Sequence, residues 1–155
     1  MNCDNYNQFM QNAIDEAKKA RSIGEVPVGA VIVLENKIIG SGYNKRETSK
    51  NALSHAEIEA INEACKTLGS WRLLNCDLYV TLEPCPMCIG AIINSRIKKV
   101  VFGCADPKSG SCGSLINLTD LPYNHRPEIV SGIMKDECST LLSDFFKNLR
   151  KIKLF

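Results

Sequence analysis

The sequence lacks a long apolar run, a strong excess of charge of one sign, and any internal repeat. Its longest apolar stretch, Val28 to Leu34, is far too short to span a membrane. The first residues, Met1 to Asn5, lack the basic and apolar regions of a signal peptide, so we expect a cytoplasmic protein without membrane contact. A formal net charge of +2 gives no indication of nucleic-acid binding through bulk charge. With 155 residues, 45% of them hydrophobic, we expect one domain over residues 1–155.

Cysteine, in contrast, is frequent, with eight residues in the chain. In a small exported protein an even number would suggest disulfides, but the missing export signal favours a reducing compartment and a metal site. Cys85 and Cys88 belong to a motif discussed below, whereas Cys104 and Cys112 only bracket a loop and have no assignable role. We expect six free thiols, most of them small core residues: Cys3, Cys65, Cys76, Cys104, Cys112 and Cys138.

The hydrophobic pattern predicts helices and strands in alternation. We expect helices from residue 6 to near residue 24 and over residues 55–68, 86–93 and 136–150, and strands over residues 28–34, 38–43, 78–82 and 99–103. The segment 104–128 is rich in glycine, serine and proline, and we expect it to be mostly irregular before a further strand. This order predicts a mixed five-stranded sheet covered on both faces, a three-layer α/β/α sandwich. Sites in such sheets lie beyond the strand ends, where helices begin.

Two short motifs, H-x-E and P-C-x-x-C, carry most of the chemistry of this sequence. His55, Cys85 and Cys88 offer one imidazole and two thiolates, and three protein ligands leave a tetrahedral zinc ion one open position, as in catalytic sites. The two cysteines are three residues apart, which at the start of a helix places both on one face. Pro86 suits the first helical position, and the positive helix end favours thiolates.

Glu57 is placed to move protons at such a site. It lies two residues from His55, and within one helix these side chains would point in roughly opposite directions. Both can serve one ion only if it lies off the helix end, so we expect two helix N-termini to face one zinc. Zinc would lower the pKa of a bound water, and Glu57 would accept and return its proton. The resulting hydroxide suits attack on an electron-poor ring carbon with loss of ammonia.

Other interpretations of the same residues are open at this point. The pattern Ser54-x-x-Glu57 is also a capping box, in which the glutamate would only cap its helix. The C-x-x-C pair could be a redox pair. A structural zinc would need a fourth ligand from Cys76, Cys104, Cys112 or His125. The combination of both motifs, each at a predicted strand-to-helix junction, favours a catalytic zinc.

These motifs and several longer segments resemble one family. The chain is similar to the cytidine/deoxycytidylate deaminase superfamily and, within it, to the bacterial deaminases of tRNA adenosine; the zinc signature itself is a known mark of base deaminases. The resemblance covers nearly the whole chain. It is carried by segments 25–31, 42–44, 55–58, 81–88, 95–97, 100–103, 106–110, 113–115, 124–126 and 142–146.

The resemblance implies a cytidine deaminase-like fold and a homodimer with one zinc per subunit. The implied reaction is hydrolytic deamination of adenosine to inosine at the wobble position of a tRNA anticodon. Zinc-bound hydroxide would attack C6, and Glu57 would be the proton shuttle. His55, Cys85 and Cys88 would bind the metal.

The resemblance also implies contacts to the RNA. Asn44 would hydrogen-bond the flipped base, and Val28 would line its pocket. Flanking nucleotides would meet Asp106, Lys108, Ser109, Asn124, His125 and Arg126. The basic end, comprising Lys147, Arg150, Lys151 and Lys153, is expected to reach phosphates. For Phe145 and Phe146 we expect core and dimer packing.

Two other functions fit the zinc signature. One is deamination of free guanine or cytosine by the same superfamily, which would not need the loop Asp106–Gly110 or the basic end. The other is a zinc-stabilised RNA-binding module without catalysis.

Overall fold

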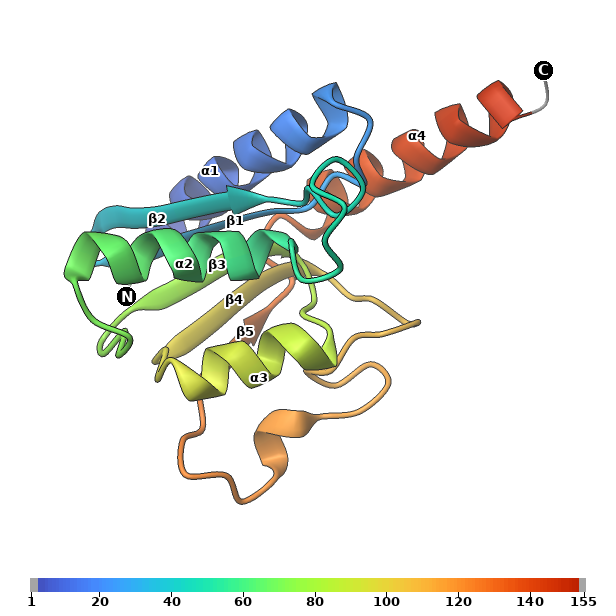
Figure 1. Cartoon of the computed structure of the whole chain (residues 1–155). Coiled ribbons are helices and arrows are strands. Elements are labelled where there is room, and N and C mark those ends of the chain that lie inside the picture. Colours follow the sequence, from blue (N-terminus) through green and yellow to red (C-terminus); the bar gives the residue numbers. More distant parts are fainter. Residues whose placement is uncertain (1–2, 154–155) are drawn as a thin grey trace.

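The computed structural model describes the backbone of residues 3–153 and the side chains of residues 5–152 (Figure 1). Within this part, helices and strands alternate as the hydrophobic pattern predicts. The strands are β1 (Gly29–Leu34), β2 (Lys37–Tyr43), β3 (Asp77–Leu82), β4 (Lys99–Cys104) and β5 (Glu128–Ser131). The helices are α1 (Cys3–Ser22), α2 (Ala56–Leu68), α3 (Pro86–Asn94) and α4 (Lys135–Lys153), with a short 3-10 helix, η1 (Leu118–Asp120).

The five strands form one mixed sheet in the order β2-β1-β3-β4-β5, which confirms the expected sheet. Strand β1 pairs antiparallel with β2 and β3, whereas β3, β4 and β5 are parallel. The first five residues of β1 are buried, because neighbouring strands flank it on both sides and helices cover both faces. This explains its nearly continuous apolar sequence.

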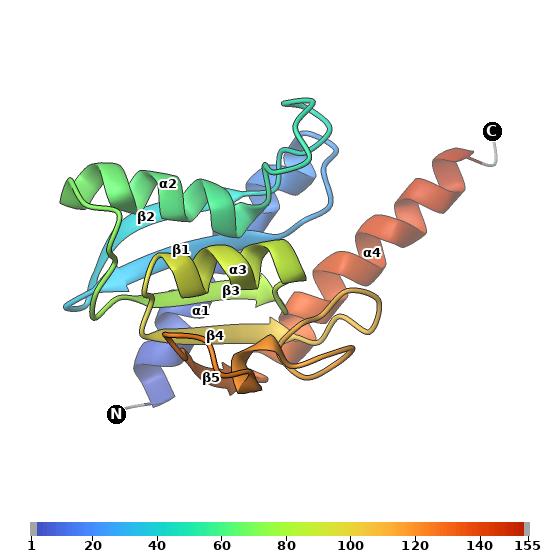
Figure 2. The ribbon, with the colours of Figure 1, turned by 60° about the horizontal axis from the view of Figure 1, so that its bottom comes forward.

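Helices cover both faces of the sheet, so the expected three-layer arrangement is also confirmed (Figure 2). Helices α2 and α3 lie on one face, over a core that includes Ile32 and Val80. Helices α1 and α4 cover the other face, where Val31 and Tyr79 contribute, as expected from the alternation of side chains along a strand. The C-terminal half of α4 projects beyond the sheet in both views.

The close packing of α2 on β2 depends on Gly42. A Cβ atom at this position would lie 2.5 Å from the carbonyl oxygen of Ala56 and 2.6 Å from the backbone nitrogen of Ala60. The missing side chain therefore lets the first turn of α2 approach the strand closely. This contact fixes the position of His55, the residue that precedes the helix.

The remaining expectations concern cysteines and membranes. The described cysteines outside the motif are all free, and Cys76, Cys104 and Cys138 are buried as expected. The side chains of Cys3 and Lys153 lie outside the described residues. No helix in the described part of the chain is long and apolar enough to cross a membrane.

Candidate active site

His55, Cys85 and Cys88 meet where two helices begin. His55 is the N-cap of α2, Cys85 is the N-cap of α3, and Cys88 lies in the first turn of α3. The Nδ1 atom of His55 lies 3.6 Å from the Sγ atom of each cysteine, and all three ligand atoms lie within 4.8 Å of one another. Two helix N-termini therefore face one point, as the spacing of the motifs predicts.

The three side chains fit a tetrahedral zinc ion. Zinc–nitrogen and zinc–sulfur bonds of about 2.05 and 2.3 Å at a tetrahedral angle would place the two ligand atoms about 3.6 Å apart. This matches the observed separation of 3.6 Å. Within the described residues no fourth histidine, cysteine or carboxylate joins the cluster. The arrangement is that of an open site, and the four candidate ligands of a structural zinc do not complete it.

The Cys85 thiol already favours metal binding, whereas the Cys88 thiol does not. The pKa of Cys85 is lowered to about 4, first because Cys88 donates a hydrogen bond to it and then because His55 lies beside it. The same hydrogen bond, together with burial, raises the pKa of Cys88. One thiolate is thus present near neutral pH, and a cation would be needed to ionise the second.

Glu57 lies in the first turn of α2, next to this cluster. Its side chain is buried, and burial raises the pKa of its carboxyl to about 7, with a further rise from the charge of Cys85. The capping-box interpretation does not hold, because the N-cap is His55 rather than Ser54 and makes no side-chain cap bond. A carboxyl with a pKa near neutrality can both accept and donate a proton.

A cavity of about 410 Å³ opens above these residues. Its floor contains His55, Glu57 and Cys85, and its volume lies in the range of small-molecule sites. Five residues expected to contact the substrate line its walls: Val28, Asn44, Asp106, Lys108 and Ser109. The structure thus brings two of the predicted metal ligands, Glu57 and five of the predicted contacts to one cavity, whereas the third ligand, Cys88, is fully buried.

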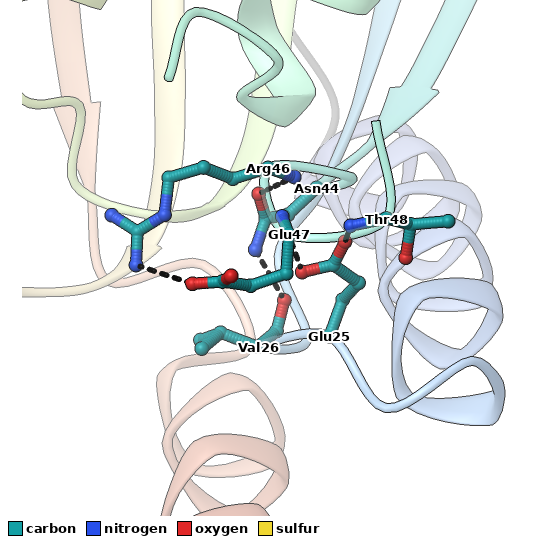
Figure 3. A network of polar contacts seen from close by, with 6 residues as sticks. All are labelled: Glu25, Val26, Asn44, Arg46, Glu47 and Thr48. Carbon is teal, nitrogen blue, oxygen red and sulfur yellow. Dashed lines mark hydrogen bonds and ion pairs between the residues drawn. The ribbon is translucent and has the colours of Figure 1, made fainter. Parts of the chain in front are cut away.

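The side chain of Asn44 is held in place by the backbone (Figure 3). Its Nδ2 atom donates to the carbonyl of Val26 at 3.2 Å, and its Oδ1 atom accepts from the backbone nitrogen of Arg46 at 3.2 Å. One amide hydrogen and one acceptor lone pair are left for another partner. Asn44 can therefore present a fixed donor and acceptor to a base.

The side chain of Asp106 shapes the opposite wall. Its Oδ1 atom accepts hydrogen bonds from the backbone nitrogens of Lys108 and Ser109, and its Oδ2 atom accepts from the Ser109 hydroxyl at 2.8 Å. This is an Asx-type turn, which the Asp-Pro sequence favours. The turn presents Lys108 to solvent at the rim.

Several predicted contacts lie outside the lining of this cavity: Asn124, His125, Arg126, Lys147, Arg150 and Lys151. The ring of His125 is bonded to the carbonyl of Ile97, before β4 begins, whereas the cavity lies beyond the end of that strand. Asn124 is exposed beside it, and neither residue lines the cavity. Arg150 lies on the projecting half of α4 and is also outside the cavity lining. Arg126 instead bonds the carbonyls of residues 120 and 121.

The cavity also contains residues that the motifs do not predict. Arg46 contributes to one wall, while Leu142 and Phe146 of α4 contribute to another. Phe146 is 41% exposed in this chain, so it is not a core residue, and the expected dimer packing stays a prediction. The spacing of four residues between Leu142 and Phe146 was the available signal, because it places both on one helix face.

Several known proteins that resemble this chain are deaminases. Residues 4–150 match the family model of the MafB19-like deaminases. A tRNA-specific adenosine deaminase of Bacillus subtilis (strain 168) is 54% identical over 146 residues, which is 94% of this chain and 91% of the relative. A solved structure from work on A-to-I editing by tRNA:A34 deaminases superimposes with a TM-score of 0.85 at 40% identity, over 87% of this chain and 99% of that one. A guanine deaminase from Bacillus subtilis is 41% identical with a TM-score of 0.61, over 68% of this chain and 66% of that one.

Proposed function

The chain belongs to the family of the tRNA-specific adenosine deaminases, and from this premise we propose that it converts the wobble adenosine of a tRNA anticodon to inosine. The observation that carries the proposal is the open His55–Cys85–Cys88 cluster, with Glu57 beside it, at the floor of a cavity walled by two loops. We take residues 1–155 to work as a single deaminase domain.

The proposed reaction is hydrolysis at C6 of the adenine ring. Water adds its oxygen to C6, the bond from C6 to the amino nitrogen breaks, and ammonia leaves. A zinc ion held by His55, Cys85 and Cys88 would supply a Lewis acid that activates the water. Glu57 would take one proton from the water and deliver it to N1 of the ring, and would then pass the second proton, from the hydroxyl added at C6, to the departing amine.

The cavity walls would select the substrate. Asn44 offers its spare amide hydrogen and lone pair to the edge of the base, and Val28 provides an apolar surface for the ring. The loop that contains Asp106, Lys108 and Ser109 would hold the flanking nucleotides. An anticodon loop presents bases that are already unpaired, so moving one into the cavity costs less than it would from a duplex.

The assay that tests this function compares two substrates. Purified protein with zinc is incubated with an anticodon stem-loop carrying adenosine at the wobble position, and inosine is measured by mass spectrometry of the digested RNA. We expect one inosine per stem-loop and no turnover of free guanine, cytosine or adenine. The guanine deaminase similarity makes the free base the second candidate, and turnover of a free base without inosine in the RNA would reject our proposal.

The salt dependence of RNA binding tests the basic residues. Replacing Lys108, Arg150 and Lys151 together by alanine should weaken binding and reduce the slope of log K against log salt by about 0.7 for each lost phosphate contact. The measurement is fluorescence anisotropy of a labelled stem-loop at several salt concentrations. Lys37→Ala is the single-charge control, because this exposed lysine is the first residue of β2, whereas Asn44 of the cavity follows the other end of that strand. An unchanged slope in the triple variant would remove these residues from the interface.

We also propose a homodimer with one zinc per subunit, acting in the cytoplasm, where its tRNA substrate would be found. Exposed apolar side chains on the segment around η1 support self-association, since such patches on small proteins commonly mark interfaces. They are Leu115, Ile116, Leu121 and Tyr123. A single monomeric species in sedimentation velocity at micromolar concentration would contradict the dimer. Asn124 and His125 follow this segment directly, so a dimer could bring them to the partner's cavity.

A further inference from the structure

Two buried glutamates beside the cavity take no part in the proposed chemistry. Glu25 and Glu83 are each 2% exposed. In the described part of the chain, neither forms an ion pair within 4.0 Å. Each instead accepts hydrogen bonds from backbone N–H groups of a loop that lines the cavity. Because a buried carboxylate needs these bonds, its position and that of the loop depend on each other.

Glu25 holds the loop that leads from β2 to α2 (Figure 3). Its Oε1 atom accepts from the backbone nitrogen of Glu47 at 3.2 Å, and its Oε2 atom accepts from that of Thr48 at 2.7 Å. Burial alone would raise the pKa of Glu25, but the hydrogen bonds from Thr48 and Glu47 outweigh it, and the pKa is lowered. The charged carboxylate therefore anchors the segment that carries Asn44 and Arg46 to the cavity wall.

Glu83 holds the opposite loop through both of its oxygens. Oε1 accepts from the backbone nitrogen of Asp106 at 3.1 Å and from the Ser114 hydroxyl. Oε2 accepts from the backbone nitrogens of Cys112 at 3.0 Å and Ser114 at 3.1 Å. The loop passes so close that a Cβ atom on Gly110 would lie 2.4 Å from the carboxyl carbon of Glu83. Residues 106, 112 and 114 of this loop thus all bond the Glu83 carboxylate.

We propose that Glu25 and Glu83 are positioning residues, which hold the two loop walls of the cavity at the spacing that the RNA substrate requires. The inference rests on the proposed function and deepens it, because it assigns substrate fit to two carboxylates outside the metal cluster. Residues 44 and 46 form one wall and residues 105–109 form the other. The metal ligands and Glu57 lie at the helix N-termini, so a displaced wall weakens substrate binding while the metal stays in place.

The test uses Glu25→Gln and Glu83→Gln in the full-length zinc-loaded protein. Glutamine keeps the size of the side chain, but its NH₂ group meets a backbone N–H donor where an acceptor oxygen stood. We expect KM for the anticodon stem-loop to rise about tenfold or more in each variant, with kcat within about threefold of wild type. Zinc content should stay at one ion per chain.

Amide hydrogen exchange measures directly how firmly the two loops are held. Glu25→Gln should speed exchange in residues 45–49 only, and Glu83→Gln in residues 106–114 only. Glu47→Gln is the control, because it removes one negative charge from the loop that Glu25 holds, at a side chain that is 84% exposed and lies 4.0 Å from the Arg46 guanidinium. This variant should neither speed amide hydrogen exchange nor raise KM. Ser114→Ala removes one of the four bonds to Glu83 and should raise KM by a smaller factor, and Glu25→Asp should do the same for the other wall.

If a glutamine variant does not fold, Ser114→Ala and Glu25→Asp test the positioning role instead. Unchanged exchange, or faster exchange with unchanged KM, would overturn the positioning role, as would loss of zinc with loss of kcat. If wild-type protein forms no inosine, the proposed function fails. Hydrogen exchange then decides by itself whether the two carboxylates hold the loops, so the two failures are distinguishable.

Discussion

Replacing Glu57 by glutamine is expected to abolish inosine formation and to leave one zinc ion bound per chain. Glutamine has the same size, so the buried site keeps its shape, but it can neither accept nor donate the proton. A general acid–base group contributes about 10² to 10⁴ in rate, and Glu57 would act in more than one transfer. We therefore expect kcat to fall at least a thousandfold with little change in RNA affinity.

Single-turnover deamination of the stem-loop and zinc analysis by mass spectrometry are the measurements for this variant. Glu59→Gln is a matched control on the same helix, and it should retain most of the activity, since Glu59 pairs with Lys45 at 3.6 Å and does not line the cavity. Loss of zinc from Glu57→Gln would show that this carboxylate supports the metal, and the assigned proton shuttle would be wrong. Normal turnover by Glu57→Gln would also reject the assignment of Glu57 as proton shuttle.

The second large effect is expected from Cys88→Ala. Removing one of three protein ligands should weaken zinc binding by about a hundredfold or more and abolish deamination. The ligands also join the first turns of α2 and α3, neither of which has a side-chain cap bond at its N-cap residue. Zinc binding should therefore stabilise the folded state, and added zinc should raise Tm in the wild type but not in the variant.

Cys76→Ala is the control for this experiment. Cys76 is as fully buried as Cys88, so the loss of a buried sulfur is matched, but it does not belong to the metal cluster. It should bind one zinc, respond to zinc in Tm, and remain active. A Cys88→Ala protein that keeps stoichiometric zinc and turns over RNA would disprove the ligand assignment. Calorimetry with and without a chelator gives the Tm values.

Much of the site could be predicted because its signals are local. The spacing of Cys85 and Cys88, together with Pro86, defines a helix N-terminus within four residues, and the two-residue spacing from His55 to Glu57 leaves one geometry for a shared ion. The long apolar strands and amphipathic helices also follow from their own sequences. The weakest strand, β5, has no fully buried residue, and its sequence carries little pattern.

The rest depends on contacts between distant parts of the chain. Glu83 bonds residues that lie 23 to 31 positions later, and nothing near it in the sequence indicates those partners. Phe146 reaches the cavity because α4 extends past the sheet on that side, which helical periodicity alone does not show. His125 was expected at the cavity but lies at the other end of β4, because the path of segment 104–128 carries it there.

The placement of chemistry on helix ends and of recognition on loops has an evolutionary consequence. The metal ligands and Glu57 are fixed by the packing of α2 and α3 on the sheet, so few substitutions there preserve the centre. The side chains of Arg46 and Lys108 are exposed, so these positions can change in size and charge at little cost to stability while the backbone of both loops stays bonded to Glu25 and Glu83. Selection can therefore redirect such a deaminase to a new base or nucleic acid by changing its loops, while the ancestral reaction is inherited unchanged.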